Sequence, residues 1–409
     1  MANKDNSMNY SNLFTAKELG LVDRERETKQ LMYALFTREH MLLMGPAGTA
    51  KSQFATNAFS TVDKSNLFSI HLTKQTTEEY VYGPLNIVEL KKGNLIHNTT
   101  NSILDADFAF LDEFFDASDV LLRSLLGVLN ERKWMKGSQQ MPAKLHTAII
   151  TSNYQRENDV TQAVLDRIIF KADIKPITAK GNRIRVYKGY LSKPDFIPKK
   201  LIDIEKLKAF SDLVEKPGSV KFGKDVLDAY DDLVTEFSKE SKKYISQRTA
   251  NKALKVVKAS ALLNNRDDAT FEDLEELKYV FCVLNRRIEE EIFDAVFERC
   301  VGKVEEERSI MNDLDQIEAK VSSMPTDFGQ LKDADFITKM RELNEYGQLI
   351  QKMVSPTPKV VAKKRALTDR IRDLVATNRD KLFKKDTDIN KISPSNNASD
   401  NNAIEGDIL

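Results

Sequence analysis

The chain has 409 residues, which is enough for two or three domains. Its 62 Lys and Arg residues balance 62 Asp and Glu residues, so it lacks the basic surplus that is typical of dedicated nucleic-acid binders. No apolar run approaches the roughly 20 residues of a membrane helix. The start of the chain is polar, and two cysteines and four scattered histidines suggest no disulfide framework and no side-chain metal site, so we expect a reduced, cytoplasmic protein without a secretory signal or a membrane partner.

Up to about residue 176, short β-rich runs alternate with helical stretches. Apolar runs of this length, separated by helices, predict an α/β fold in which a five-stranded parallel sheet has helices on both faces. Two segments with turn residues interrupt the pattern, and we interpret both as β-hairpin insertions. These insertions are residues 86–98 and 132–144, and the predicted strands are residues 40–44, 66–72, 107–112, 146–152 and 168–174.

Amphipathic helices dominate the chain after about residue 200. One is residues 246–263, and another is residues 270–284, for which Thr270 is a suitable N-cap. From about residue 303 the helices become longer and more charged, and their apolar residues recur in steps of four and three, which is typical of an antiparallel helical hairpin or coiled coil. These residues are Ile310, Leu314, Ile317 and Val321, then Phe336, Met340, Leu343 and Ile350, and Pro356 and Pro358 are expected to separate them from a last helix at about 359–383.

The stretch Met41–Ala55 reads MLLMGPAGTAKSQFA and has the outline of a phosphate-binding loop, G-x-x-x-x-G-K-[ST], with Ala50 in place of the last glycine. Such a loop works because backbone N–H groups and a helix N-terminus surround a phosphate. Lys51 can then reach the β- and γ-phosphates, and Ser52 can bind Mg²⁺. Alanine is tolerable at this position if Ala50 already has helical φ and ψ. The alternative to a phosphate-binding loop is an ordinary strand–turn–helix.

Two further groups of polar residues follow predicted strands. FAFLDEFF places Asp112 and Glu113 at a strand end, where one carboxylate can support Mg²⁺ and the next can activate water for attack on a γ-phosphate. AIITSN places Asn153 at the end of the next strand, where it can orient that water. Taken singly, the carboxylates could be a solvated strand end and Asn153 could be a cap, but together with the loop they favour an ATPase.

At these residues the chain resembles a family. The segments GPAGTAKS, FLDE, TSN, VLDRIIF and SQR are similar to AAA+ ATPases of the MoxR group, and most similar to its RavA-like branch. That branch typically has G-P-P-G-x-A-K-S in the loop, so the resemblance implies that the alanine is a family trait. The resemblance extends through TTEEYVYGPLNIVELKKGN and LLRSLLGVLNERKW, covers about residues 12–285 and is absent from about 303 onward.

The resemblance implies roles for matching positions. Lys51 and Ser52 would serve the phosphates and Mg²⁺ of ATP, Asp112 would support the metal, Glu113 would be the general base and Asn153 would be sensor 1. The residues that would hold ATP are Gly45, Pro46, Ala47, Gly48, Thr49, Ala50, Lys51, Ser52 and Asp112.

Three arginines also match the family pattern. Arg167 resembles the arginine finger that reaches a neighbouring subunit's γ-phosphate; its alternative is a salt bridge with Asp166. Arg132 is a weaker second candidate for a contact with a neighbour. Arg248 matches sensor 2, which could tie the lid to the nucleotide; its alternative is a solvated arginine at a helix start.

The leading hypothesis is an ATP-driven machine that remodels proteins or protein–metal assemblies as a ring, expected to be a hexamer. The resemblance implies a partner with a von Willebrand factor A domain. The two insertions would face a pore or substrate, although Trp134 in the second is more typical of a core. The helices of Ile310–Val321 and Phe336–Ile350 would either dock the partner or pack on the lid.

Two other classes remain as alternatives. Related AAA+ groups with the same insertions act on nucleic acid, and a basic stripe over Lys91, Lys92, Arg132, Lys133 and Lys136 would favour that. A slow, ATP-switched scaffold is the third class, which Glu113 counts against. The predicted domains are a disordered tail at 1–11, the AAA+ nucleotide-binding domain at 12–178, an all-α lid at 179–302, a coiled-coil-like helical region at 303–385 and a disordered tail at 386–409.

Overall fold

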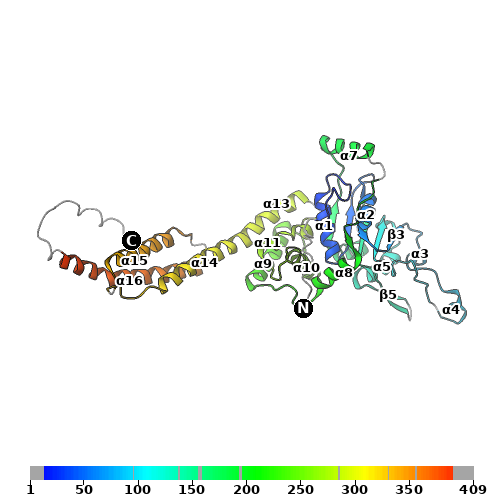
Figure 1. Ribbon diagram of the computed structural model, residues 1–409. Coiled ribbons are helices and arrows are strands. Elements are labelled where there is room, and N and C mark those ends of the chain that lie inside the picture. The colour runs from blue at the N-terminus through cyan, green and yellow to red at the C-terminus, as the bar shows by residue number, and fades with distance from the viewer. Residues whose placement is uncertain are drawn as a thin grey trace. The chain divides into compact units, whose positions relative to one another are not determined.

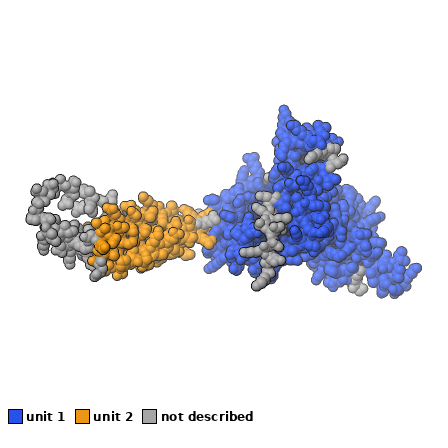
Figure 2. All heavy atoms as spheres, in the orientation of Figure 1, with its two compact units in different colours: residues 1–301 blue, residues 302–409 orange. Residues whose placement is uncertain are grey.

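The computed structural model describes residues 13–389, apart from residues 95, 137–138, 155–158, 193–195, 284–285, 330 and 355–356. The chain forms two compact units that divide between residues 301 and 302 (Figure 2). Within the described residues, no helix is both long and apolar enough to cross a membrane.

The first unit is built on a parallel sheet (Figure 1). The sheet has five strands in the order β3-β4-β7-β1-β8. β1 pairs in parallel with β7 on one side and β8 on the other, so that Met41 lies beside Ile149 and Phe170. The five strands and their α/β class were therefore predicted correctly. Their bounds are β1 Met41–Met44, β3 Leu67–His71, β4 Phe108–Asp112, β7 Thr147–Ser152 and β8 Phe170–Asp173.

Burial explains why the central strands β1 and β4 are nearly continuous apolar runs. All six residues of β7 are buried, whereas the edge strand β3 alternates between exposed and half-buried residues. Helices α1 and α2 pack against the sheet, α1 on β1 and β8 and α2 on β4 and β7. The helices of this α/β part are α1 Glu25–Phe36, α2 Lys51–Ser60, α3 Glu78–Tyr82, α4 Ile87–Lys91, η2 Phe114–Asp116, α5 Asp119–Glu131 and α6 Asp159–Arg167.

The first insertion differs from the predicted β-hairpin. Its ends approach through one antiparallel bridge, Leu85 to His97, but its tip is the short helix α4. The Asn86 side chain accepts hydrogen bonds from the N–H groups of Val88 and Glu89, which caps the first turn of the helix. A side-chain cap therefore favours a helix where the Gly93-Asn94 pair suggested a β-turn.

The second insertion is the β-hairpin that was predicted. β5 (Lys133–Lys136) pairs antiparallel with β6 (Gln139–Pro142), and the expected turn at Gly137 lies outside the described residues. Trp134 is 2% exposed, and its ring centroid lies 5.2 Å from that of Tyr82 and 5.1 Å from that of His97. Trp134 is therefore a core residue that fastens the hairpin to the sheet layer.

The rest of the first unit is mainly helical. In addition, β2 (Val62–Asp63) pairs with β9 (Ile202–Asp203), and Lys221 forms an isolated bridge with Asp268. Ser246 caps α10 by accepting from Thr249 N–H, and Thr270 N–H donates to Asp273 Oδ2 (2.8 Å), as expected of a capping box. The helices are α7 Lys180–Ser192, α8 Ile204–Glu215, α9 Lys224–Ser241, α10 Gln247–Leu263, α11 Phe271–Glu275, α12 Lys278–Phe281, α13 Arg286–Phe297 and η3 Glu298–Gly302.

The second unit consists of α14 (Lys303–Ser322), α15 (Asp333–Lys352) and α16 (Pro358–Ile389). The apolar residues predicted to line two helices form one cluster, which α16 completes with Val360, Leu367 and Ile371. The arrangement is thus three packed helices rather than a two-helix hairpin. α16 therefore covers the apolar stripes of α14 and α15, and docking of a partner on these two helices stays a prediction.

Candidate nucleotide-binding site

The loop between β1 and α2 has a backbone that demands small residues. Gly45 has a φ of 148°, and a Cβ there would lie 2.2 Å from the carbonyl oxygen of Ile174. Gly48 has a φ of 79°, but a Cβ there would meet nothing within 4 Å. Gly45 is therefore required by a close approach to the end of β8, and Gly48 is required by its backbone conformation alone.

Ala50 adopts a left-handed conformation, with φ 66° and ψ 28°. The condition under which alanine would cost little here, right-handed helical φ and ψ, is therefore not met. The left-handed conformation costs an alanine about 1–2 kcal/mol relative to the right-handed one. Strain of this kind is commonly held at sites that bind ligands.

We expect Ala50→Gly to stabilise the protein slightly. Relief of the strain is offset in part by the extra freedom of glycine in the unfolded chain, which costs about 0.4–1 kcal/mol. The matched change Gly48→Ala should destabilise, because it places a Cβ at positive φ in open space. Denaturation curves of the two variants would measure both signs, and a marked loss of stability in Ala50→Gly would contradict the strain argument.

Lys51 connects the loop to two neighbouring strand ends. Its Nζ donates hydrogen bonds to the carbonyl oxygens of Gly45 (2.7 Å) and Pro46 (3.0 Å) and to Asn153 Oδ1 (2.7 Å). The Asn153 Nδ2 in turn donates to Glu113 Oε1. Burial lowers the pKa of Lys51, and the carboxylates of Glu113 and Asp112 oppose that shift. The structure thus brings Lys51, Asn153 and Glu113, which follow β1, β7 and β4, into one hydrogen-bonded chain.

The two carboxylates at the end of β4 lie in different surroundings. Asp112 Oδ1 accepts hydrogen bonds from the Thr151 hydroxyl and the Glu113 N–H, and Oδ2 lies 3.5 Å from His71 Nδ1. Glu113 is left-handed, with a φ of 50°. Its Oε2 is buried without a hydrogen-bond partner among the described residues. An unpaired buried carboxylate oxygen is costly, so Oε2 is well suited to accept a proton from a bound water.

His71 and Thr151 were not predicted as parts of this site. The available signal was their position, since both lie at the carboxyl ends of parallel strands, where the site forms. Ser52 lies in the first turn of α2 and is exposed. The described residues contain no cluster of three or more His, Cys, Asp or Glu side chains that could hold a metal ion. A Mg²⁺ here would thus need phosphate and water oxygens beside the hard oxygens of Ser52 and Asp112.

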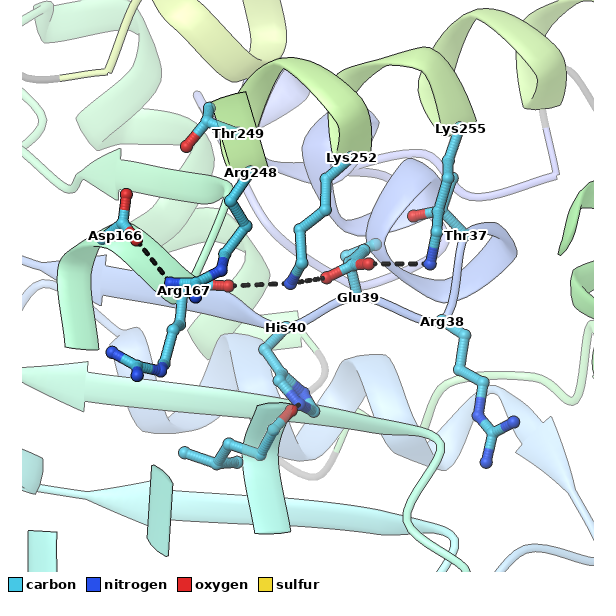
Figure 3. A network of polar contacts seen from close by, with 12 residues as sticks. Thr37, Arg38, Glu39, His40, Asp166, Arg167, Arg248, Thr249, Lys252 and Lys255 are labelled. Atoms are coloured by element: carbon cyan, nitrogen blue, oxygen red, sulfur yellow. Dashed lines mark hydrogen bonds and ion pairs between the residues drawn. The ribbon is translucent and has the colours of Figure 1, made fainter. Parts of the chain in front are cut away.

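Arg167 and Arg248 lie at the edge of the sheet where the strands begin, opposite the loop between β1 and α2. Arg167 ends α6, three residues before Phe170, and Phe170 pairs with Met41, the residue of β1 farthest from the loop. Arg167 donates to its own helix at Ala163 (2.9 Å), while Asp166 forms an ion pair with Arg248 (2.7 Å; Figure 3). The salt bridge considered for Arg167 is therefore made by Arg248 instead, and among the described residues Arg248 forms no hydrogen bond or ion pair with the loop of its own chain.

Arg132 is a structural residue rather than an exposed contact. Its guanidinium donates to the carbonyl oxygens of Arg38 (2.8 Å), His146 (3.0 Å) and Leu129. Burial lowers its pKa to about 10, so it stays charged at neutral pH. The interpretation of Arg132 as a second residue reaching a neighbour was therefore wrong.

A network of polar contacts that the sequence did not predict joins the lid to the sheet (Figure 3). Glu39, just before β1, accepts hydrogen bonds from two lysines of α10, Lys252 (2.7 Å) and Lys255 (3.0 Å). Lys252 also donates to the carbonyl oxygen of Arg167 (2.9 Å). Burial alone would raise the pKa of Glu39, but the two lysines outweigh it and hold that pKa below its ordinary value. The buried charge is thus compensated by both partners.

Comparison with known proteins relates this chain to a family. A model of the MoxR domain in MoxR–vWA–β-propeller ternary systems matches residues 10–201, and a model of an AAA lid domain matches residues 225–290. Uncharacterized protein MJ0079 of Methanocaldococcus jannaschii is 28% identical over 76% of this chain and 81% of its own length. Uncharacterized protein MJ0812 of the same organism is 30% identical over 64% of this chain and 68% of its own length.

Among solved structures, that of a candidate ATPase from Cytophaga hutchinsonii matches with a TM-score of 0.54 and 20% identity, over 68% of this chain and 92% of that one. Identity at this level shows a common fold. Together, the two family models span the residues of the five-stranded sheet, of the loop between β1 and α2, and of the helical lid described above. The chain belongs to the MoxR family of AAA+ ATPases.

Proposed function

We propose that this protein is a Mg²⁺-dependent ATPase whose site lies at the carboxyl edge of the sheet. The observation that carries the proposal is the Lys51–Asn153–Glu113 chain, in which one oxygen of Glu113 is held and the other is buried without a partner among the described residues. Structural ion pairs normally satisfy both oxygens of a buried carboxylate. A half-satisfied carboxylate beside a phosphate loop is what a general base for water requires.

Each residue then has a distinct task. The loop from Gly45 to Thr49 and the N-terminus of α2 hold the phosphates of ATP, and Lys51 turns its ammonium group toward them. Ser52 and Asp112 provide oxygens for Mg²⁺, which neutralises charge on the phosphates when it is bound. Asn153 fixes Oε1 of Glu113, so that Oε2 can take a proton from the attacking water.

The active assembly is a ring of identical chains, which we expect to be a hexamer. Arg167 cannot serve the loop of its own chain from the opposite edge of the sheet, so its finger role needs a neighbour. Arg248 lies beside Arg167 and would approach the same neighbouring site. The helix α7 stands apart from the other helices of its unit in Figure 1 and buries none of its residues. Its exposed Tyr187, Tyr190 and Leu191 are the kind of surface that an assembly covers.

The ring would use ATP to remodel a protein or to help assemble a protein or metalloprotein complex in the cytoplasm. The description of the matching family model names a vWA domain and a β-propeller beside the MoxR domain. This supports a partner with a von Willebrand factor A domain. Membership of the RavA-like branch, which rests on the loop alanine and on the similarity of the segment TTEEYVYGPLNIVELKKGN, is part of the same proposal.

A motor acting on nucleic acid is the weaker alternative. The lysines of the two insertions would have to form a basic stripe, but Lys92 pairs with Glu89 (2.8 Å) and Lys136 pairs with Glu78 (2.5 Å). These ion pairs interrupt the stripe and leave less positive charge for a phosphate backbone. A slow ATP-switched scaffold is the other alternative. The rate of ATP turnover distinguishes such a scaffold from an ATPase motor.

Steady-state ATP hydrolysis by the wild-type protein, measured against protein concentration, tests the proposal. We expect turnover per chain to rise with concentration to a plateau, because each site is completed by a neighbour, and to stop when Mg²⁺ is chelated. Absence of turnover at every concentration, with ATP still bound, would favour the scaffold.

A further inference from the structure

We infer that Lys252, on the lid helix α10, is a positioning residue that holds the Arg167 finger in place for the neighbouring site. The inference rests on the function proposed above and goes beyond it. It states that the lid affects catalysis in the next subunit through Lys252, a residue that does not itself touch the nucleotide.

The first step is the contact between Lys252 and the finger. Lys252 Nζ donates to the main-chain oxygen of Arg167 at 2.9 Å. Arg167 is the last residue of α6, so its carbonyl is one of those that the helix leaves without an internal partner. A lysine ammonium at a helix C-terminus satisfies that oxygen and is favoured by the helix dipole. The contact therefore fixes the backbone from which the Arg167 side chain projects.

The second step is what holds Lys252. Its ammonium also donates to Glu39 Oε2 at 2.7 Å, and the side chain of Glu39 is only 5% exposed. Glu39 stands directly before β1, and its own N–H donates to the carbonyl oxygen of Ala34 in α1 (2.9 Å). Lys252 is thus anchored to the rigid sheet layer on one side and to the finger on the other (Figure 3).

The third step is a second lid contact beside the first. Arg248 lies one helical turn before Lys252 on α10, and it pairs with Asp166, the residue preceding the finger, at 2.7 Å. One face of α10 therefore holds two consecutive residues of α6. Within the described part of the chain, the Arg167 guanidinium itself donates only to Ala163 in its own helix. The lid thus holds the backbone of Arg167, whereas the guanidinium of Arg167 makes few contacts.

The consequence is that lid and finger move together. A catalytic group displaced by about 1 Å can lose about 10²-fold in rate. Loss of the Lys252 contact should therefore lower kcat without changing the KM for ATP, because the phosphate loop of the same chain is untouched.

Lys252→Met in the full chain tests the inference, and Lys255→Met is its matched control. Both lysines lie on α10 and bind Glu39, but only Lys252 reaches the Arg167 carbonyl. We expect Lys252→Met to lose roughly 10–10²-fold in kcat with an unchanged KM, and Lys255→Met to keep the wild-type kcat. Mixing Lys252→Met with Glu113→Gln before assembly should restore turnover, because the Glu113→Gln chain supplies an intact finger to the intact site of its neighbour.

The possible results separate this inference from the function on which it rests. If Arg167→Ala keeps its turnover, the finger role fails and the inference fails with it. If Arg167→Ala is inactive but Lys252→Met behaves as Lys255→Met does, the finger stands and the positioning role is overturned. If Lys252→Met is inactive and mixing does not restore turnover, the substitution has damaged its own site and the positioning role is likewise overturned.

Discussion

Glu113→Gln is expected to remove nearly all ATP hydrolysis while ATP still binds. Glutamine keeps the shape of the side chain and an oxygen that can accept from Asn153, but it cannot take a proton from water. A general base contributes about 10²–10⁴-fold to the rate, so turnover should fall by that factor. Hydrolysis assays together with ATP titrations would separate the lost chemical step from retained binding.

Glu131→Gln is a suitable control for this prediction. Glu131 is an exposed residue at the end of α5, so the same chemical change there should leave turnover at the wild-type rate. If Glu113→Gln hydrolysed ATP within a few-fold of wild type, the half-satisfied carboxylate would not be the base. The function would then have to rest on another group at the strand ends.

The sheet was predictable because burial acts directly on composition. A strand covered on both faces is mostly apolar, and β4, in which all four residues from Phe108 to Leu111 are apolar and buried, shows this pattern clearly. The positions where these strands end were also predictable, because the polar residues Asp112 and Asn153 stand at the ends of the predicted strands. Their chemistry could be expected to converge, since parallel strands end on one side of the sheet.

Local conformation in short segments was less predictable. The tip of the first insertion carries both a turn signal, Gly93-Asn94, and a capping residue, Asn86, and only the structure shows that the cap prevails. The left-handed backbone of Ala50 arises because the chain must turn from β1 into α2 around Gly45. That conformation is imposed by loop closure rather than by the residue, so alanine itself gave no indication of it.

The contacts around Arg167 could not be predicted from the sequence because they are not local. Glu39 and Lys252 are separated by 213 positions, and each belongs to a segment that has an ordinary appearance by itself. The same holds for the burial of Arg132, whose partners come from three different segments. Residue type and spacing identify a motif, but they do not show which charged residues from distant helices meet in the interior.

Arg167→Ala is expected to lower turnover by about 10³-fold or more, because arginine fingers in other NTPases contribute about 10³–10⁵-fold. Binding of ATP should persist, since Arg167 lies at the opposite edge of the sheet from the loop. The variant should also fold normally, since its guanidinium donates only to Ala163 among the described residues. Arg123→Ala, which removes an exposed arginine of α5, is the matched control and should hydrolyse ATP as wild type does.

Mixing experiments decide in which chain Arg167 acts. An Arg167→Ala chain keeps an intact base and a Glu113→Gln chain keeps an intact finger, so a mixed ring contains some complete sites although neither variant is active alone. Turnover of the mixture well above the sum of its parts would place Arg167 opposite a neighbour's phosphate loop. If Arg167→Ala binds ATP, remains inactive and gains nothing from the mixture, its role would lie within its own chain. The separation of the finger from its own loop across the sheet would then need an explanation other than ring assembly.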